Sequence, residues 1–221
     1  MVYPDNVDDQ LSSSVSNPKL VKRRRELIVR SAITQFSEKG YYKTTIQDIA
    51  RDAGFSQGFI YQYFKDKEEL LFFALQVVLR KYIEEIPKRV STTRHPLDRL
   101  CATITSYCQI NDEARDATVL AYRSSRSLPK EKRQVLQKLE EETNQFFHAP
   151  LADAIESGLI TELNTDLMVY QYIHFCHGWA LKYWHFGSRY TMDEYIRGGL
   201  QILVRPFLTD AGRSYWEKYH A

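Results

Sequence analysis

The chain has 221 residues, of which 43% are hydrophobic and 26% charged, an ordinary balance for a globular protein. No apolar run approaches the roughly 20 residues that a membrane-spanning helix needs, and the acidic, polar N-terminus does not resemble a signal peptide. Composition therefore argues against a membrane or secreted protein, and we expect the chain in the cytoplasm. Only 9 glycines and 7 prolines are present, which favours a mostly helical fold.

The formal net charge of +2 is unevenly distributed along the chain. Residues 1–18 carry three aspartates and no base, whereas residues 19–67 carry eleven Lys or Arg against five acids, which leaves a net charge of −1 for residues 68–221. Phosphate neutralisation by Lys and Arg supplies most non-specific DNA affinity, so the basic segment is the candidate for nucleic-acid binding. Residues 1–18 are rich in Ser, Asn and Asp without periodicity, which predicts a disordered tail.

A basic run opens the first predicted helix, which ends at Gly40. Basic residues near a helix N-terminus oppose the helix dipole. We therefore interpret Arg23, Arg24 and Arg25 as an arm that contacts phosphates or the minor groove. The alternative is a solvated start of a helix.

Residues 44–70 contain two short helical patterns separated by a tight turn. Thr45 is a suitable N-cap for the first helix and Ser56 for the second, and Gly54 can end the first because glycine reaches the left-handed conformation. The inward residues are Ile46, Ile49, Ala50 and Ala53 in the first helix and Ile60 and Phe64 in the second. This order of helix, glycine turn and helix predicts a helix-turn-helix.

The outer face of the second helix carries no acid between Ser56 and Lys65. Phosphates repel carboxylates, and hydrogen-bonding side chains read base edges, so this face suits the major groove. We predict base contacts from Gln57, Phe59 and Gln62. Phosphate contacts are predicted from Thr45, Ser56, Tyr61, Tyr63 and Lys67, and Thr44 and Gly58 complete the predicted DNA-binding set.

This stretch resembles the DNA-binding domain of the TetR family of bacterial transcriptional regulators, over roughly residues 22–70. The matching residues are Thr45, Ile49, Ala50, Ala53, Gly54, Ser56, Gly58, Ile60, Tyr61, Phe64, Lys67 and Leu70. Phe55 and Tyr63 depart from the usual small aliphatic residue and histidine without breaking the geometry. The resemblance implies a homodimer that places two recognition helices about 34 Å apart on a near-palindromic operator. It also implies a small-molecule effector that lowers DNA affinity, with repression as the default.

The remainder predicts helices and no credible strand, so we expect an all-α fold. A linking helix over residues 67–87, ended by Pro87, should join the helix-turn-helix domain (19–66) to a ligand-binding and dimerisation domain (88–221) and transmit changes between them. Further helices are expected over residues 96–111, 113–127, 129–158, 166–186 and 192–207, with a kink at Pro150.

The helix over residues 166–186 is aromatic and apolar nearly all round, so it must be buried on two sides. The final predicted helix is also apolar, and Gly198 and Gly199 would allow a close approach between helices. We predict that these last two helices form the homodimer interface across a two-fold axis, as the resemblance also implies. A plain monomer core is the alternative.

The resemblance implies an effector pocket in the C-terminal domain. Its candidate lining is Tyr107, Tyr122, Phe147, Tyr172, Phe175 and Trp179, with Arg123 and Arg126 placed to meet an anionic group. Aromatic walls with arginines would suit an acyl or aromatic coenzyme A thioester. The alternative is an ordinary aromatic core beside a solvated turn.

Other chemistries find little support in the sequence. The odd set Cys101, Cys108 and Cys176 fits buried thiols in a reducing compartment. His174 and His177, with His185 further on, have spacing that could seat a metal, but no carboxylate or cysteine completes a set, so we expect hydrogen-bonded histidines and no metal or other cofactor.

Two other function classes compete with a regulator. No nucleophile–base constellation or phosphate loop supports an enzyme. A non-specific architectural DNA protein would need a chain that is basic throughout, whereas residues 68–221 are slightly acidic.

Overall fold

A computed structural model describes residues 17–219 of the chain. Residues 1–16 of the expected disordered tail (1–18) lie outside the described residues. Within residues 17–219 the chain forms helices, and its only extended pairing is a single bridge between Ile160 and Leu208, which confirms the all-α prediction. Its contacts divide it into two units, Met1–Lys81 with Ala114–Glu140, and Tyr82–Glu113 with Glu141–Ala221.

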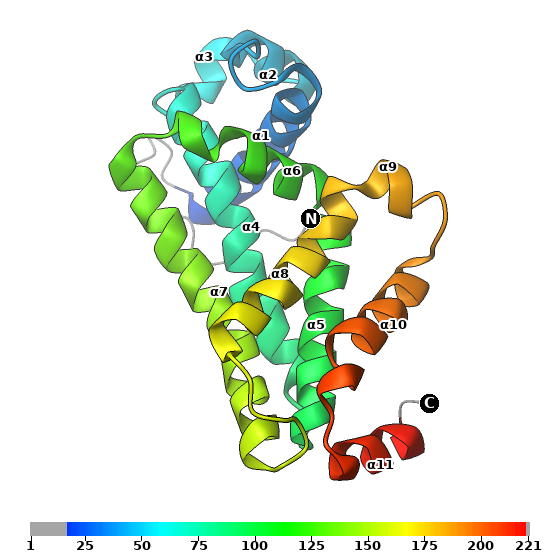
Figure 1. Cartoon of the computed structure of the whole chain (residues 1–221). Helices are drawn as coiled ribbons and strands as arrows, with labels where there is room; N and C mark the ends of the chain where they lie inside the picture. The colour runs from blue at the N-terminus through cyan, green and yellow to red at the C-terminus, as the bar shows by residue number, and fades with distance from the viewer. Residues whose placement is uncertain (1–16, 220–221) are drawn as a thin grey trace. The chain divides into compact units, whose positions relative to one another are not determined.

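The first unit is built on three N-terminal helices, α1 (Pro18–Lys39), α2 (Ile46–Ala53) and α3 (Gln57–Ile60) (Figure 1). It also holds the start of α4 (Lys67–Val90), α6 (Arg115–Ser124), the 3₁₀ turn η2 (Ser125–Ser127) and the start of α7 (Lys130–Glu156). The Asn17 side chain accepts from the Leu20 backbone N–H and caps α1. The helix therefore begins inside the segment 1–18 that we expected to be disordered.

Burial of the predicted apolar stripes explains why these helices pack. Ile28 and Ala32 of α1 and Ile49 of α2 are fully buried, as is Ile60 of α3, and α1 packs against both α2 and α6. Burying a side chain of this size contributes about 1.5–3 kcal/mol relative to leaving it exposed. The helix-turn-helix geometry thus rests on a small core that the sequence pattern predicts.

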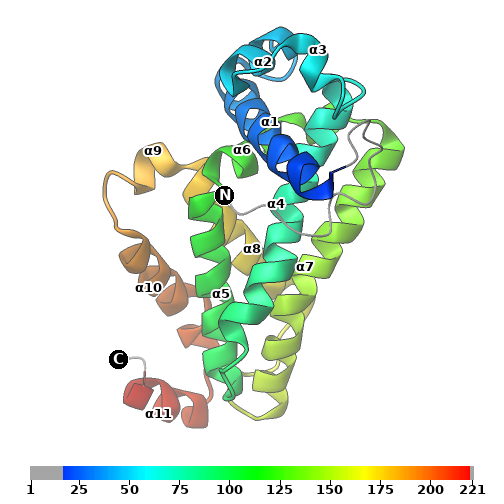
Figure 2. The same ribbon diagram turned by 180° about the vertical axis from the view of Figure 1, so that it is seen from behind.

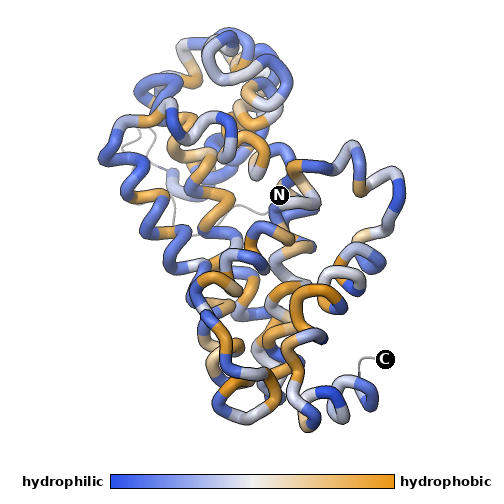
Figure 3. Tube along the Cα trace, in the orientation of Figure 1, coloured by the Kyte–Doolittle hydropathy of each residue, from blue (hydrophilic) through white to orange (hydrophobic). Residues whose placement is uncertain are grey.

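The second unit contains the end of α4, α5 (Pro96–Glu113), the end of α7 and α8 (Thr165–Leu181). It continues with α9 (Tyr183–Phe186), α10 (Met192–Leu203), the 3₁₀ turn η3 (Arg205–Phe207) and α11 (Asp210–Tyr219). Helix α5 packs against both α8 and α10 (Figures 1 and 2). Figure 3 shows hydrophobic positions recurring along α5 and α8. Leu100 and Ile104 of α5 and Val169 and Ile173 of α8 are buried.

Two expected helix ends are wrong. Pro87 lies inside α4, which continues to Val90. Proline removes one N–H and clashes with the preceding turn, but Pro87 is exposed in the last turns, where water can bond the freed carbonyl. The helix expected over residues 166–186 instead breaks at Lys182, whose φ of −122° and ψ of 28° end α8 before the short α9 begins.

The C-terminal end also differs from the sequence-based expectation. Helix α10 ends at Leu203, and the segment with Pro206 forms the 3₁₀ turn η3 in place of a helix to residue 207. A further helix, α11, was not predicted, because only Gly212 and Trp216 of it are buried, which leaves no regular stripe. Gly212 lies so close to the Leu159 carbonyl oxygen that a Cβ there would approach it to 2.0 Å.

The neighbouring glycines of α10 make a matched pair. A Cβ on Gly199 would lie 2.0 Å from Phe175 Cζ of α8, whereas a Cβ on Gly198 would meet nothing within 4 Å. Gly199→Ala should destabilise the second unit by about 1–3 kcal/mol through overpacking. Gly198→Ala should be neutral or stabilise it by up to about 1 kcal/mol, because alanine favours a helix interior. Thermal unfolding of the two variants checks this, and equal melting temperatures would contradict the close packing of α10 on α8.

Candidate DNA interface and effector site

Two capped helix starts and one glycine set the geometry of the helix-turn-helix. Thr45 and Asp48 form a capping box at α2, in which each side chain bonds the other residue's backbone N–H. The Thr45 hydroxyl and backbone N–H both donate to the Asp48 carboxyl, as does Lys39, and these bonds hold the pKa of that carboxyl well below its usual value. Gly54 is left-handed at φ 73° and ψ 30°, and the Ser56 hydroxyl accepts from the Phe59 N–H at 3.2 Å to start α3.

The predicted base-reading face of α3 is open to solvent. The helix is shorter than the sequence predicts, because α3 ends at Ile60 and residues 61–63 form a turn. Gln57 and Gly58 of α3 and Gln62 of that turn are exposed, and Tyr61 is 49% exposed. Phe59 is half-buried, with its ring 4.5 Å from Phe55 and 5.1 Å from Tyr63 between centroids. This face therefore presents the amides of Gln57 and Gln62 and the Tyr61 hydroxyl around the Phe59 ring. It carries no carboxylate.

The basic start of α1 reaches this aromatic centre. The Arg24 guanidinium carbon lies 5.2 Å from the Phe55 ring centroid and 5.7 Å from that of Phe59. Cation–π contacts of this kind contribute about 0.5–1 kcal/mol at exposed sites. They place Arg24 beside α3, and Arg23 is exposed on the same turn of α1. The predicted basic arm is thus a helical end in contact with the recognition segment.

Three predicted DNA contacts are buried and do not fit that role. Arg25 is 1% exposed, with its guanidinium carbon 5.9 Å from the Phe73 ring centroid. The Thr44 hydroxyl is buried and donates to the carbonyls of Gln35 and Gly40. Tyr63 is 3% exposed. Arg25 lies on the buried face of α1, and Tyr63 turns inward in the turn that follows α3. The residue types alone did not predict either orientation.

Lys67 also has a role that the sequence did not reveal. Its Nζ donates to the backbone carbonyls of Tyr41, Tyr42 and Thr44 at 3.0, 3.3 and 3.0 Å, and it lies 4.6 Å from the Tyr41 ring centroid. The ammonium therefore holds the turn between α1 and α2 at the start of α4. In this structure it supports the helix-turn-helix and is not presented to a phosphate.

The predicted effector-lining residues fall in both units. Tyr122, Arg123 and Arg126 are exposed on α6 and η2 of the first unit. In the second unit, Tyr107 of α5 packs on Phe147 of α7 at 5.1 Å, and Phe147 lies 6.2 Å from Tyr172 of α8. These three rings are buried and form a packed aromatic cluster. Trp179 donates from Nε1 to Asp112 at 2.7 Å, and Phe175 stacks on Tyr195 at 4.4 Å.

The cysteines are free and buried, which confirms the structural interpretation. Cys108 and Cys176 lie 3.2 Å apart between sulfur atoms, and burial raises the pKa of the Cys176 thiol. His174 contacts the Tyr170 carbonyl through Nδ1 at 2.6 Å, and His177 contacts the Tyr107 hydroxyl through Nε2 at 3.2 Å. No group of three or more His, Cys, Asp or Glu side chains suited to a metal occurs among residues 17–219.

His177 makes the stability of the second unit depend on pH. Burial lowers its pKa from 6.5 to about 4, so the folded protein resists protonation that the unfolded chain accepts. Stability should be constant above about pH 6.5 and fall by roughly 3 kcal/mol as the pH decreases to about 4. Urea unfolding across this range measures how the free energy of unfolding changes with pH. The decrease at low pH should be absent in His177→Gln and retained in His174→Gln, since His174 is exposed. A decrease retained in both variants would show that groups other than His177 cause it.

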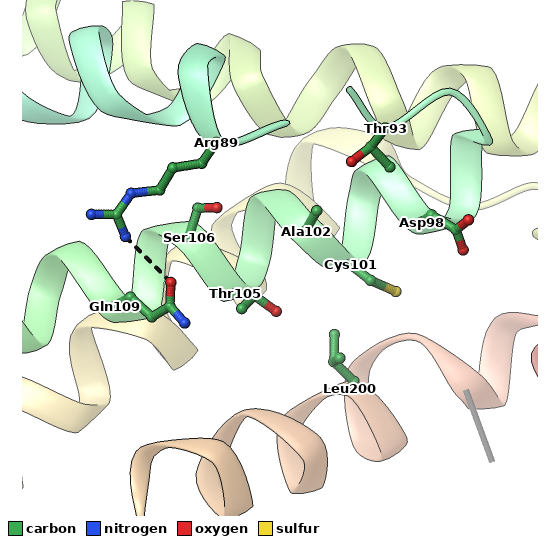
Figure 4. A pocket seen from close by; sticks show the side chains of 9 residues that line it. All are labelled: Arg89, Thr93, Asp98, Cys101, Ala102, Thr105, Ser106, Gln109 and Leu200. Carbon is green, nitrogen blue, oxygen red and sulfur yellow. Dashed lines mark hydrogen bonds between the residues drawn. The ribbon is translucent and has the colours of Figure 1, made fainter. Parts of the chain in front are cut away.

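Two open pockets lie in the second unit. The larger, of about 650 Å³, follows one face of α5 and is lined by Arg89, Thr93, Asp98, Cys101, Ala102, Thr105, Ser106, Gln109 and Leu200 (Figure 4). The smaller, of about 310 Å³, is lined by Phe175, Phe186, Tyr190, Glu194, Tyr195, Gly198, Gly199 and Ile202. Phe175 is the one predicted effector residue that lines either of them. The larger pocket had no sequence signal beyond small polar residues at helical spacing.

Comparison with known proteins decides the family. The descriptions "Bacterial regulatory proteins, tetR family" and "Tetracyclin repressor-like, C-terminal domain" match residues 28–73 and 93–194. The HTH-type transcriptional regulator HbdR of Aromatoleum sp. (strain CIB) is 43% identical over 210 residues, which cover 95% of this chain and 92% of HbdR. The chain belongs to the TetR family. It is therefore a DNA-binding transcriptional regulator.

Solved structures of TetR-family proteins agree with this fold. AibR, solved with isovaleryl coenzyme A and operator DNA, has a TM-score of 0.74 at 20% identity and covers 83% of this chain and 100% of its own. FadR of Bacillus subtilis, solved with stearoyl-CoA, has a TM-score of 0.69 at 21% identity and covers 81% and 97%. Among residues 17–219, no helix is both long and apolar enough to cross a membrane.

Proposed function

We propose that this TetR-family protein is a repressor that binds a near-palindromic operator as a homodimer and is released by an acyl or aromatic coenzyme A thioester. The observation that carries the DNA-binding part is the exposed, acid-free face of α3 beside Arg24. Gln57 and Gln62 can each offer an amide to a base edge. Thr45, Ser56 and Tyr61 are exposed for phosphate contacts. We propose that the protein acts where the DNA is, in the cytoplasm, and that it is not an enzyme.

We propose the homodimer interface on α8 and α10. These helices expose large apolar side chains, with Leu167 62% and Ile202 70% exposed, and water contact at such positions is unfavourable. Two-fold packing of α8 and α10 against the same helices of a partner would cover them. From the sequence we expected α8 and α10 to be the last two helices of the chain. Helix α11 follows them, and we keep the proposed interface on α8 and α10.

The effector class is proposed from the relatives and from the second unit. AibR and FadR were solved with coenzyme A thioesters. The buried cluster of Tyr107, Phe147 and Tyr172 is our candidate contact for the acyl or aromatic group, with Phe175 and Trp179 beyond it. Helix α4 begins in the first unit and ends in the second, so a tilt of this helix is the proposed route of release. An effector acts only through its different affinities for the two states.

Fluorescence anisotropy of labelled DNA from upstream of the gene tests this function. Isovaleryl-, benzoyl- and stearoyl-CoA are added to the protein–DNA complex, each beside its free acid and beside free CoA. Release by one thioester, and not by its acid, is the expected result. If no thioester releases the DNA, the proposed effector class is wrong, whereas the role as a DNA-binding regulator stands.

A non-specific architectural role is the competing class. Equal affinity for operator and random duplex at about 150 mM salt, where phosphate contacts alone are weak, would favour it.

A further inference from the structure

The larger pocket of the second unit is lined mostly by uncharged side chains, with Arg89 and Asp98 as the charged ones. Asp98, Ala102, Thr105 and Gln109 recur at helical spacing along one face of α5, and Leu200 projects toward that face from α10 (Figure 4). Arg89 and Thr93 close the side formed by the end of α4 and the following turn. A volume of about 650 Å³ lies in the usual range for small-molecule sites.

The charges at the ends of this pocket are already engaged by the protein. The Arg89 guanidinium bonds Gln109 at 3.3 Å and Glu113 at 3.1 Å and lies 4.0 Å from Glu85. Asp98 accepts from the Tyr215 hydroxyl at 2.7 Å. Burial raises the pKa of the Cys101 thiol to about 12, so this side chain is neutral. A strongly anionic ligand group would meet two glutamates behind the only arginine of this lining.

The middle of the pocket offers hydroxyls that the protein itself does not use. Within residues 17–219, the Thr93, Thr105 and Ser106 hydroxyls bond no other part of the chain, although Ser106 is only 5% exposed. By contrast, Thr103 on the same helix donates to the Arg99 carbonyl at 2.9 Å. A hydroxyl that bonds no other protein group can donate to and accept from a bound ligand or water. Ala102, Cys101 and Leu200 supply apolar surface beside these groups.

We propose that this pocket binds the uncharged pantetheine arm of the coenzyme A thioester, an inference that rests on the proposed effector class. The arm carries two amides, a hydroxyl and methyl groups, and it separates the charged phosphates from the acyl group. Its amides and hydroxyl match Thr93, Thr105 and Ser106, and its methyl groups match Ala102 and Leu200. The uncharged middle of the pocket, with Arg89 and Asp98 already bonded within the protein, suits this arm and neither of the charged ends of coenzyme A.

Two variants and one matched control test the pocket by isothermal titration with benzoyl-CoA, isovaleryl-CoA and free CoA. Ala102→Leu fills the pocket and should weaken binding at least about tenfold. Thr105→Val keeps the shape and removes one hydroxyl, so it should weaken binding about three- to tenfold. Thr103→Val, whose hydroxyl bonds its own helix, should bind like wild type. Operator affinity without effector should be unchanged in all three, which shows that they fold.

Comparing the fold-loss of affinity for the three ligands shows which part of coenzyme A the pocket binds. Because the arm is common to all three ligands, each variant should weaken them by the same factor. Wild-type affinity for thioesters in both Ala102→Leu and Thr105→Val would overturn the pocket and leave the effector class intact. A loss confined to the acylated ligands would assign the pocket to the acyl group and overturn the inference. If wild type binds none of the three ligands, the effector class and the pocket fall together.

Discussion

Replacing Gln57 and Gln62 together by alanine should lower operator affinity by about a hundredfold or more and leave affinity for random duplex unchanged. Both amides are exposed, Gln57 on α3 and Gln62 in the turn that follows it, and a bidentate amide–adenine contact discriminates by about 1–3 kcal/mol. No charge is altered, so the phosphate term that dominates non-specific binding stays the same. Anisotropy titrations on both duplexes measure the two affinities.

A matched double variant controls for the loss of two glutamines. Gln134 and Gln137 are exposed on α7, in the same unit as α3, and their replacement by alanine should change neither affinity. Equal losses on operator and random duplex in the Gln57/Gln62 variant would show that these residues do not read sequence. Preserved operator affinity would place base recognition on other residues.

Replacing Leu167 and Ile202 together by aspartate should separate the dimer and abolish tight operator binding. Both side chains are large, apolar and more than half exposed on α8 and α10, so the substitutions disturb no core contact within the chain. Two carboxylates in each copy would be buried and unpaired in the proposed interface, which costs several kcal/mol per charge. Loss of the linked second half-site should then lower operator affinity by about a hundredfold.

Analytical ultracentrifugation and anisotropy give the two readouts for this variant. Tyr219→Asp is the control, because Tyr219 is 58% exposed on α11, outside the proposed interface, and it should remain dimeric. A Leu167/Ile202 variant that stays dimeric with full operator affinity would place the interface on other helices.

The helix-turn-helix was predictable because local chemistry determines it. Thr45 and Ser56 cap their helices as expected, and Gly54 has the left-handed conformation that ends α2. Each of these features is fixed by residues within four positions of one another. The exposed Gln57 and Gln62 follow from the same short-range geometry.

Features that depend on distant residues were not predictable from the sequence. Lys67 bonds carbonyls more than twenty positions away, and Arg25 is covered by Phe73, so neither side chain showed its role in a local pattern. The contacts between α6 and α1 group residues 114–140 with the helix-turn-helix, whereas from the sequence we expected them in the C-terminal domain. The periodicity of a helix does not tell which domain the helix packs against. The pocket along α5 requires α10 to face it, and no spacing rule specifies that pairing.

The most direct test of the account is a gel-shift titration on the DNA upstream of the gene against random duplex, at about 150 mM salt, with and without the three thioesters. We predict tight binding to one site in that DNA, at least about a thousandfold weaker binding to random duplex, and release by one thioester. Equal affinity for both duplexes, with or without thioester, would contradict sequence-specific regulation by this protein.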